Sequence, residues 1–469
     1  MIAPGETCSS NLRQRGLALL MVLVLLVLGV AYVISAPLSA ARLRAEREET
    51  SATALAQAKE ALIAYALTYG EMHPNKVPGF LLCPETGNSA IATPEGSADL
   101  SCGTKDTSAI GRLPWRTLGL PPLRDGSGEC LWYAVSGSFK NNPASDMMNW
   151  DSNGQLAVKG ADDTSFIAGT TPESLAAAVV FAPGAATGKQ DRSAVAKTSI
   201  CGGNFDPRNY LEAFGSADNS AVSPIPGAVS TFFVGGTANG GNDRLQAITP
   251  QDIFGAIRKR TDFNATLKGF TQRVAMCLAG YGRLNAAGAS DKRLPWAAPV
   301  GLADYAVDSN YDDSGNALSG RLPYRVNNSK SATANAMVQT SLITGDNCPG
   351  SWSPLDDNWY RNWKDHLFYA LASSFSPGAA TPSVCGNCLS VNGAGAYAAI
   401  VMFAGSRLAG QKRSSLADKA AIANYLEERN STNHTNPGGS SDYQGGPTTT
   451  GFNDILYCID SSLAVAPCS

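Results

Sequence analysis

The sequence has few of the residues that most often carry chemistry at neutral pH. Its 469 residues include three histidines, His73, His366 and His434, which are far apart in the chain and make a weak case for a histidine metal site. It also lacks a G-x-S-x-G elbow, a phosphate-binding P-loop, an H-E-x-x-H pair and a dinucleotide-binding glycine motif in a strand–helix context. The sequence therefore predicts that the protein is not an enzyme and needs no organic cofactor.

Charge is scarce as well. Charged residues make up 16% of the chain, where about a quarter is usual, and the net charge is −3 with no basic run. This composition argues against a nucleic-acid partner. Hydrophobic residues make up 44%, enough to bury a sizeable core, which excludes a mini-protein held together only by disulfides.

One long segment has no charge at all. No charged side chain occurs from Leu17 to Ala36, and 20 helical residues span about 30 Å, the thickness of a bilayer core. After it, alternating Arg and Glu residues are followed by an apolar stripe at helical spacing that ends before Gly70: Leu55, Ala58, Leu62, Tyr65, Tyr69. The spacing predicts one helix over 17–70, apolar all round at first and amphipathic later. A cleaved signal peptide and a plain membrane anchor are both open alternatives.

The start of this helix resembles the type IV pilin and type II secretion pseudopilin family. A short basic leader, Arg13-Gln14-Arg15-Gly16, ends in glycine, and an apolar segment then runs into an amphipathic helix with a proline at Pro37. The resemblance covers Arg13 to about Tyr69. It implies that a prepilin peptidase cuts between Gly16 and Leu17 and that the new amino terminus, on Leu17, is methylated.

One residue departs from the family pattern. Most pilins carry a glutamate five residues into the mature chain, and this chain has Met21 there. A carboxylate in an apolar helix bundle is costly unless it is paired. A subunit without it cannot make the bond to a neighbour's amino terminus that the family is thought to use. The resemblance therefore implies a low-copy or tip subunit, like the K-type pseudopilin and some minor pilins.

Eleven cysteines occur, and the ten that follow the apolar segment suit an oxidising compartment. Sequence cannot give their connectivity. The close pairs Cys83/Cys102 and Cys458/Cys468 are our candidates, and the second would close a C-terminal loop as in many pilins. Cys385-Gly-Asn-Cys388 is a CxxC, which we interpret as a structural disulfide, with a redox motif and half of a zinc site as alternatives.

An acidic segment is a candidate site for a calcium ion. Asp308, Asn310 and Asp312 alternate along the chain and are followed by Gly315, a pattern that resembles a calcium loop. The glycine comes too late for an EF-hand and no glutamate closes the loop. A solvated turn is the alternative to calcium binding.

The rest of the chain contains an internal repeat. Six short matches occur in the same order, although the loops between them differ in length. They begin at Arg112 and Arg321, Leu131 and Leu367, Ala178 and Ile400, Gly188 and Gly410, Asn209 and Asn424, and Asn242 and Asn453. A helical stripe from Phe263 to Tyr281, preceded by a capping box at Thr249 and Asp252, matches Leu55–Tyr69. Each copy is therefore predicted to be a helix laid on a small sheet.

The fold class predicted is α+β: a long N-terminal helix followed by two duplicated helix-on-antiparallel-sheet units. The segments are 1–16 (leader), 17–70 (helix), 71–249 and 250–469 (the two units), with two halves of a single sheet as the alternative to separate domains. Residues 416–429 are predicted to be helical and 430–450 to be a mobile loop. The strands predicted are 131–136, 176–182, 231–234, 367–372, 398–404 and 454–459.

The function predicted from the resemblance is a structural minor pilin or pseudopilin of a type IV pilus or type II secretion filament. The alternative is an anchored or pilus-tip adhesin or substrate-binding module. The implied partners are other pilin or pseudopilin subunits, the prepilin peptidase and the inner membrane. The implied location is the inner membrane, with the globular part in the periplasm, and later the pilus or pseudopilus.

Overall fold

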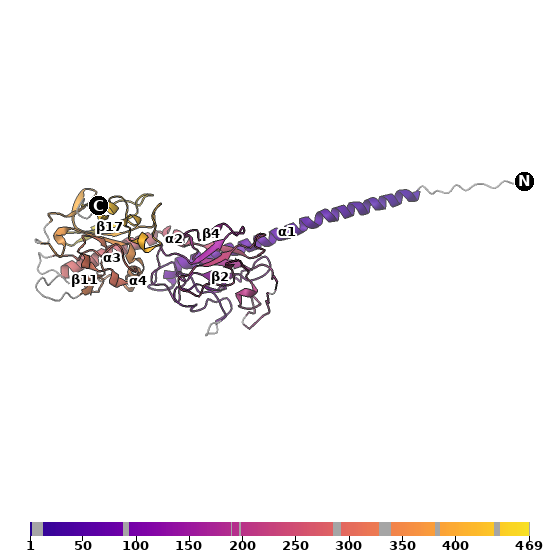
Figure 1. The fold of residues 1–469 in the computed structure, drawn as a ribbon, viewed down its shortest axis with the longest axis horizontal. Coiled ribbons are helices and arrows are strands. Elements are labelled where there is room, and N and C mark those ends of the chain that lie inside the picture. Colours follow the sequence, from indigo (N-terminus) through magenta and orange to yellow (C-terminus); the bar gives the residue numbers. More distant parts are fainter. Residues whose placement is uncertain are drawn as a thin grey trace.

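The fold of this chain, taken from a computed structural model, is mixed α+β (Figure 1). The structure describes Met1 and residues 13–87, 93–188, 190–196, 198–284, 292–327, 339–379, 385–435 and 441–468; the side chains of 13–18, 28–40, 327 and 339 are not among those described. Helix α1 (Arg13–Met72) projects from two globular units that lie one beyond the other. We call residues 73–249 the first unit and 250–469 the second unit.

The first unit is built on an antiparallel sheet of four strands in the order β1–β2–β5–β9. The strands are β1 (Ala109–Arg112), β2 (Trp132–Val135), β5 (Ala178–Ala182) and β9 (Arg244–Ile248). Side chains alternate between its two faces: Tyr133 and Val180 point to the α1 side, whereas Trp132 and Phe181 point to a second core. Because both faces are covered, the two central strands, β2 and β5, are apolar throughout.

The second core of the first unit lies under a smaller sheet in the order β4–β3–β8. Its strands are β3 (Leu156–Lys159), β4 (Phe166–Ala168) and β8 (Ser230–Phe233), and β3 pairs with β8 in parallel. A short ribbon, β6 (Ala213–Phe214) with β7 (Ala217–Asp218), lies beside β8. The main sheet is therefore sandwiched between a helix and a sheet.

The second unit has a corresponding sheet. Its order is β10–β13–β15–β14–β16, and β17 also pairs with β15 and with β18. The strands are β10 (Ser319–Arg321), β13 (Leu367–Leu371), β14 (Leu389–Val391), β15 (Ala394–Phe403), β16 (Asp442–Tyr443), β17 (Ile455–Asp460) and β18 (Val465–Pro467). A separate hairpin joins β11 (Arg325–Asn327) to β12 (Gln339–Ser341).

Helices connect and cover this second sheet. Helix α2 (Pro250–Arg258) follows β9, and α3 (Thr261–Leu284) packs on β15 and β17. The others are α4 (Pro354–Trp363), α5 (Leu416–Lys419) and α6 (Glu428–Thr435). The predicted capping box is present at the start of α2, where Thr249 and Asp252 exchange hydrogen bonds.

Strand register confirms that the two units repeat one topology. Arg112 pairs with Trp132 as Arg321 pairs with Phe368, and both arginines begin a matched sequence motif. The hydroxyl of Tyr133 donates to the Leu82 carbonyl at 3.2 Å, and that of Tyr369 donates to the Pro295 carbonyl at 3.1 Å. β3 and β8 of the first unit correspond to β14 and β16 of the second, which are also paired in parallel.

The register corrects one of the sequence matches by one residue. Val135 pairs with Ala178, and Leu371 pairs with Ala399, so Ala178 corresponds to Ala399 and not to Ile400. Both segments are apolar at every position, because both faces of each sheet are buried. Apolar identity alone therefore could not fix the register, although a shift of one residue moves every side chain to the other face.

The C-terminal third contains two further corrections. Residues 416–429 do not form one helix: α5 ends at Lys419, and a 3-10 turn, Ile422–Asn424, precedes α6. Asn424 and Glu427 use their polar groups to hold the loop at Lys412 and the backbone at Asn453, which competes with a regular helix. Within 430–450, predicted as a loop, the described residues include most of α6 and all of β16; 436–440 lie outside the described residues.

The two units share one continuous core. A single cluster of buried apolar side chains includes Leu62 of α1, Phe254 of α2, and Trp363 and Ile459 of the second unit. At the boundary, Trp150 of the first unit packs edge-on against Trp363 with ring centroids 4.5 Å apart. We call this boundary the junction.

Candidate functional site

The clearest candidate for an interaction site is the projecting part of α1. The nine consecutive side chains from Leu19 to Val27 are all apolar, and each is at least 46% exposed. Monomeric soluble proteins rarely leave a contiguous apolar surface of this kind uncovered. We call this segment the stem; it lies on the part of α1 that projects from the globular units (Figure 1) and is an exposed apolar surface that a partner or a membrane could cover.

The later part of α1 is already buried. One face of the helix, with Ala58, Leu62 and Ala66 completely buried, covers the sheet of the first unit through β5 and β9. Between this face and the stem lie solvent-exposed charges, among them Arg42, whose Nε is 3.0 Å from Glu46 Oε1. A single helix thus runs from the exposed apolar stem, through a charged segment, into the core. We call this segment, residues 42–49, the charged collar.

Part of the predicted apolar segment lies outside the described side chains. Gly16 and Leu17, the predicted cleavage and methylation junction, fall within α1, but the structure does not describe their side chains. Met21, where the family has a glutamate, is 57% exposed in the stem. Over the residues that the structure describes, none of the helices carries an apolar stretch of the length that crossing a membrane requires.

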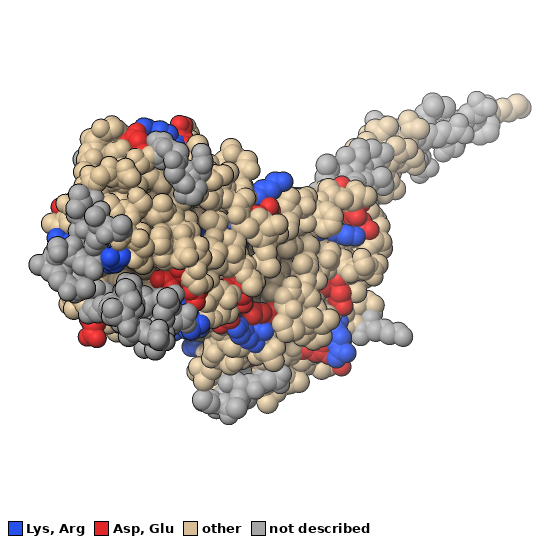
Figure 2. All heavy atoms as spheres, turned by 60° about the vertical axis from the view of Figure 1, so that its left-hand side comes forward, with Lys and Arg blue, Asp and Glu red and all other residues tan. Residues whose placement is uncertain are grey.

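One face of the two units shows no area of a single charge sign among its described residues. On the face shown in Figure 2, Lys and Arg side chains are interspersed with Asp and Glu over both units. The described stem residues carry no charge. Steering of a strongly charged partner therefore finds no support on this face.

The cysteines after the stem form five disulfides. Three are the pairs named from the sequence: Cys83–Cys102, Cys385–Cys388 and Cys458–Cys468. The other two, Cys130–Cys201 and Cys277–Cys348, each join residues 71 apart, and no spacing in the sequence pointed to them. The CxxC cysteines are bonded to each other, and Cys385 is exposed.

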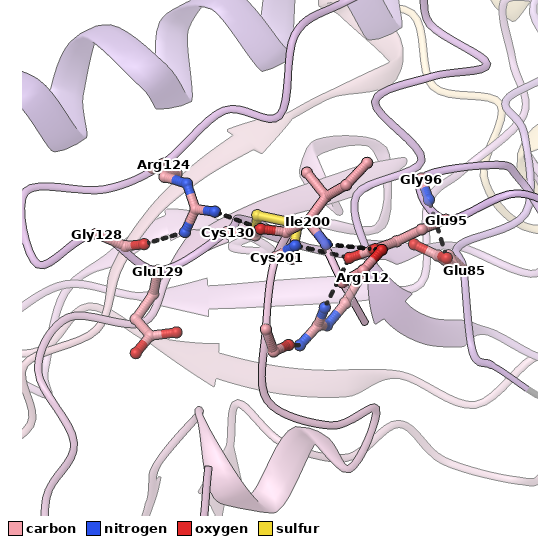
Figure 3. The surroundings of a disulfide bond; sticks show 12 residues. Glu85, Glu95, Gly96, Arg112, Arg124, Gly128, Glu129, Cys130, Ile200 and Cys201 are labelled. Carbon is pink, nitrogen blue, oxygen red and sulfur yellow. Dashed lines mark hydrogen bonds and ion pairs between the residues drawn. A yellow bond between two sulfur atoms is a disulfide. The ribbon is translucent and has the colours of Figure 1, made fainter. Parts of the chain in front are cut away.

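The Cys130–Cys201 disulfide lies in a polar cluster of the first unit (Figure 3). The buried carboxylate of Glu95 accepts hydrogen bonds from the backbone N–H groups of Ile200 and Cys201 at 2.8 and 2.7 Å. It also lies 3.7 Å from Arg112 Nη1. Nearby, burial raises the pKa of Glu85 to about 7, against the opposing effects of the Gly96 N–H and Arg112.

The three residues of the predicted calcium loop make contacts of their own. Asp308 pairs with the Lys364 ammonium, Asn310 donates to the Asp304 carbonyl at 2.8 Å, and Asp312 accepts from the Ser314 N–H at 2.8 Å. In the described part of the chain, no three His, Cys, Asp or Glu residues are arranged to hold a metal ion. Calcium binding gains no support from this geometry.

Sequence reasoning missed a buried polar network that occurs in both units. In the first unit, Arg192 stacks on Tyr210, donates to the Gly184 carbonyl at 2.9 Å and to Gln190 at 2.8 Å. In the second, Arg413 stacks on Tyr425, donates to the Gly405 carbonyl at 2.9 Å and to Gln411 at 3.2 Å. The repeated sequences around these residues were the available signal, but they did not show that the side chains meet.

A pair of carboxyl groups completes each network. Glu212 and Asp243 lie together in the first unit, as do Glu427 and Asp454 in the second, and an asparagine amide donates to each aspartate at 2.8 and 2.9 Å. Burial first, and the neighbouring glutamate second, raise the pKa of Asp243 and Asp454 well above the usual range. Burial and the neighbouring carboxyl group therefore favour the protonated form of each aspartate.

The junction brings together the only Asp–His–Asp arrangement among the described residues. His366 lies with Nδ1 2.8 Å from Asp365 and Nε2 2.9 Å from Asp151, which comes from the first unit. Burial alone would raise the pKa of Asp151, but Arg413, His366 and Arg407 together hold it below its usual range. This resembles an acid–base site, yet all three side chains are at most 1% exposed, so no substrate can reach them.

Comparison with known proteins adds no relative: no family model, curated protein or solved structure matches this chain.

Proposed function

We propose that the protein is a low-copy structural subunit of a type IV pilus or type II secretion filament, a minor pilin or pseudopilin. The observation that carries this proposal is the stem: nine exposed apolar side chains on a 60-residue helix that continues into the core of a globular unit. Burial of apolar surface contributes about 25 cal/mol per Å². A membrane first and then the helices of neighbouring subunits would supply the burial that the isolated chain lacks.

The arrangement of the two units supports a place at the end of such a filament. The second unit lies beyond the first, on the side away from the stem (Figure 1). In a filament whose stems bundle together, the space beyond one subunit's globular part is needed by the next subunit. A subunit that fills this space with a second unit of its own fits best at the tip, which agrees with the missing early glutamate at Met21.

The amino terminus of the mature protein tests the proposal directly. The full chain is expressed in a host with a prepilin peptidase, and its N-terminal peptide is identified by mass spectrometry. We expect a chain that starts at Leu17 and carries one additional methyl group on its amine. A chain that retains Met1, or that starts near Ala36–Ala41, would remove the proposal. A host without the peptidase gives the control, in which residues 1–16 stay attached.

The role of the stem is tested by introducing two lysines into it. Leu23→Lys with Leu26→Lys should shift the protein from the membrane fraction to the soluble fraction, because two ammonium groups make burial of the stem in lipid unfavourable. Leu43→Lys is the matched control, since Leu43 is also an exposed leucine on α1, at 56%, but lies in the charged collar. Loss of membrane association in both variants, or in neither, would contradict a role for the stem.

A further inference from the structure

The repeated network differs between the units in the carboxylate that neutralises its arginine. In the first unit, Arg192 Nη1 lies 3.0 Å from Glu129, a residue of the same unit. The register places Asp365 at the position of Glu129, but Arg413 does not pair with it: Asp365 contacts His366 and Lys419 instead. The partner of Arg413 is Asp151 of the first unit, at 3.1 Å.

The segment that carries Asp151 is held by the second unit along its length. The Met148 N–H donates to Asn362 Oδ1 at 2.7 Å, and the Asn149 amide donates to the Asn362 carbonyl at 2.8 Å and to Asp365 at 3.1 Å. Trp150 packs against Trp363 and Phe403. The other oxygen of Asp151 lies 3.2 Å from Arg407. Residues 148–151 therefore insert into the second unit through the Asn149 amide, the Trp150 indole and the Asp151 carboxylate. We call this segment the plug.

Burial makes this pairing consequential. The side chain of Arg413 is completely buried, and that of Asp151 is 1% exposed. Removing one partner of a buried ion pair leaves an uncompensated charge in a low dielectric, which is strongly destabilising. Among its described residues, the second unit supplies no carboxylate of its own that forms an ion pair with Arg413. Without Asp151, a buried guanidinium would have only carbonyl and amide oxygens around it.

We propose that the second unit depends on the first for this counter-charge, so that the plug at residues 148–151 locks the two units into one rigid body that unfolds as one. Although each unit has its own sheet, helix and polar network, the second is not an independent domain. Its core is also continuous with that of the first across the junction. This inference does not rest on the proposed function, since it concerns only contacts within the chain.

The test uses the full chain in detergent, with hydrogen exchange and calorimetry on wild type and Asp151→Asn. Asparagine keeps the shape of the side chain and removes its charge. We expect amides of β13 and β15 to exchange about tenfold faster or more, those of β2 and β5 to change little, and one thermal transition to separate into two. Glu129→Gln is the matched control: it removes the equivalent pair inside the first unit and should loosen β2 and β5 while leaving one transition.

If Asp151→Asn does not fold, Arg407→Gln gives a milder form of the test. Arg407 is 24% exposed and makes the second contact to Asp151, so its loss should produce the same pattern at smaller amplitude. A single transition at the wild-type temperature in Asp151→Asn, or equal loosening of both units in either variant, would overturn the proposal. Asp151→Glu, which keeps the charge, should exchange more slowly than Asp151→Asn.

Discussion

The two units share an interior and differ at their boundaries. Both bury an arginine stacked on a tyrosine, a glutamate–aspartate pair and an asparagine that donates to that aspartate. Around this common centre the neighbours differ. The positions of Glu129 and Cys130 in the first unit are those of Asp365 and His366 in the second. The internal ion pair and the disulfide of the first unit are thus replaced by contacts across the junction, from Asn149 to Asp365 and between Asp151 and His366.

The shared residues are those of the polar network inside each unit, and the differing residues are those that contact other parts of the chain. Buried polar groups need all their partners at once, so a change in one member leaves the others unsatisfied. Residues at the edge of the network are free to change once another chain segment meets them. In the second unit that segment is the plug at residues 148–151 of the first unit.

The largest expected effect is at the arginine that begins the first matched sequence motif of each unit, Arg112 or Arg321. Arg321 is completely buried, and its guanidinium donates to the carbonyls of Val300, Asp365 and Lys419. Replacing it by Met leaves these carbonyls unpaired and should cost about 3–5 kcal/mol in unfolding free energy. The measurement is urea unfolding followed by tryptophan fluorescence.

The equivalent change in the first unit should cost less. Arg112 donates to the carbonyls of Gly202 and Asn204 and pairs with Glu95, but its Nε has no hydrogen-bond partner. The Glu95 carboxylate lies 3.7 Å from Arg112 and keeps the N–H groups of Ile200 and Cys201 as donors when the guanidinium is removed, so we expect about 1–3 kcal/mol for Arg112→Met. An Arg112→Met variant less stable than Arg321→Met would contradict the view that the second unit makes the fuller use of this arginine.

A second contrast concerns the disulfides. Replacing Cys130 and Cys201 by Ser reopens a loop of 71 residues and should cost about 4 kcal/mol on chain-entropy grounds. Replacing Cys385 and Cys388 by Ser reopens a separation of 3 residues and should cost about 2 kcal/mol or less. Thermal unfolding of both double variants under oxidising conditions measures the difference. Equal losses would mean that the exposed CxxC turn supports more structure than its contacts indicate.

A further contrast is a pH dependence expected of the first unit alone. Burial raises the pKa of Glu85 to about 7, and the second unit has Ala298 at the equivalent position. A carboxyl group with a raised folded-state pKa favours folding below its unfolded-state value of 4.5, and this contribution is lost as pH rises towards about 7. After division by the intrinsic, base-catalysed exchange rate, the protection of amides in β1 and β2 should therefore fall between pH 5 and 8.

Glu85→Gln provides the control for this titration. The amide cannot ionise, so the pH dependence of exchange in β1 and β2 should flatten. Exchange in β10 and β13 should be unaffected by the substitution at any pH. An unchanged slope in Glu85→Gln would assign the titration to another group.

Several strands of the two main sheets could be predicted from the sequence, because a run of apolar residues bounded by turn residues indicates a buried strand. The predicted strand 367–372 is β13 (Leu367–Leu371), and 454–459 overlaps β17 (Ile455–Asp460) almost completely. Strands β3, β9 and β16 were missed: β16 has only two residues, and Arg244 and Gln246 interrupt the apolar residues of β9. The repeat itself was visible, but its register in one strand was not, since every residue there is apolar.

The polar interior was beyond prediction for a different reason. Asp151 and His366 are 215 residues apart, and nothing in the local sequence of either marks it as a partner of the other. The same holds for Cys277 and Cys348. The Asp151–His366 pair is set by how the two units meet, and the Cys277–Cys348 pair by how distant segments of the second unit pack together. A single sequence gives no information about either.

The continuity of α1 has a mechanical consequence. The helix that bears the stem also forms one cover of the first sheet, where Leu55, Leu62 and Tyr69 are buried over β5 and β9. A force on the stem along the helix axis would shear α1 against the strands of this sheet. The packed side chains between the helix and the sheet would resist it together. Because the plug holds the second unit to the first, we expect a force applied at the stem to be transmitted to the second unit through packed side chains, not through a flexible linker.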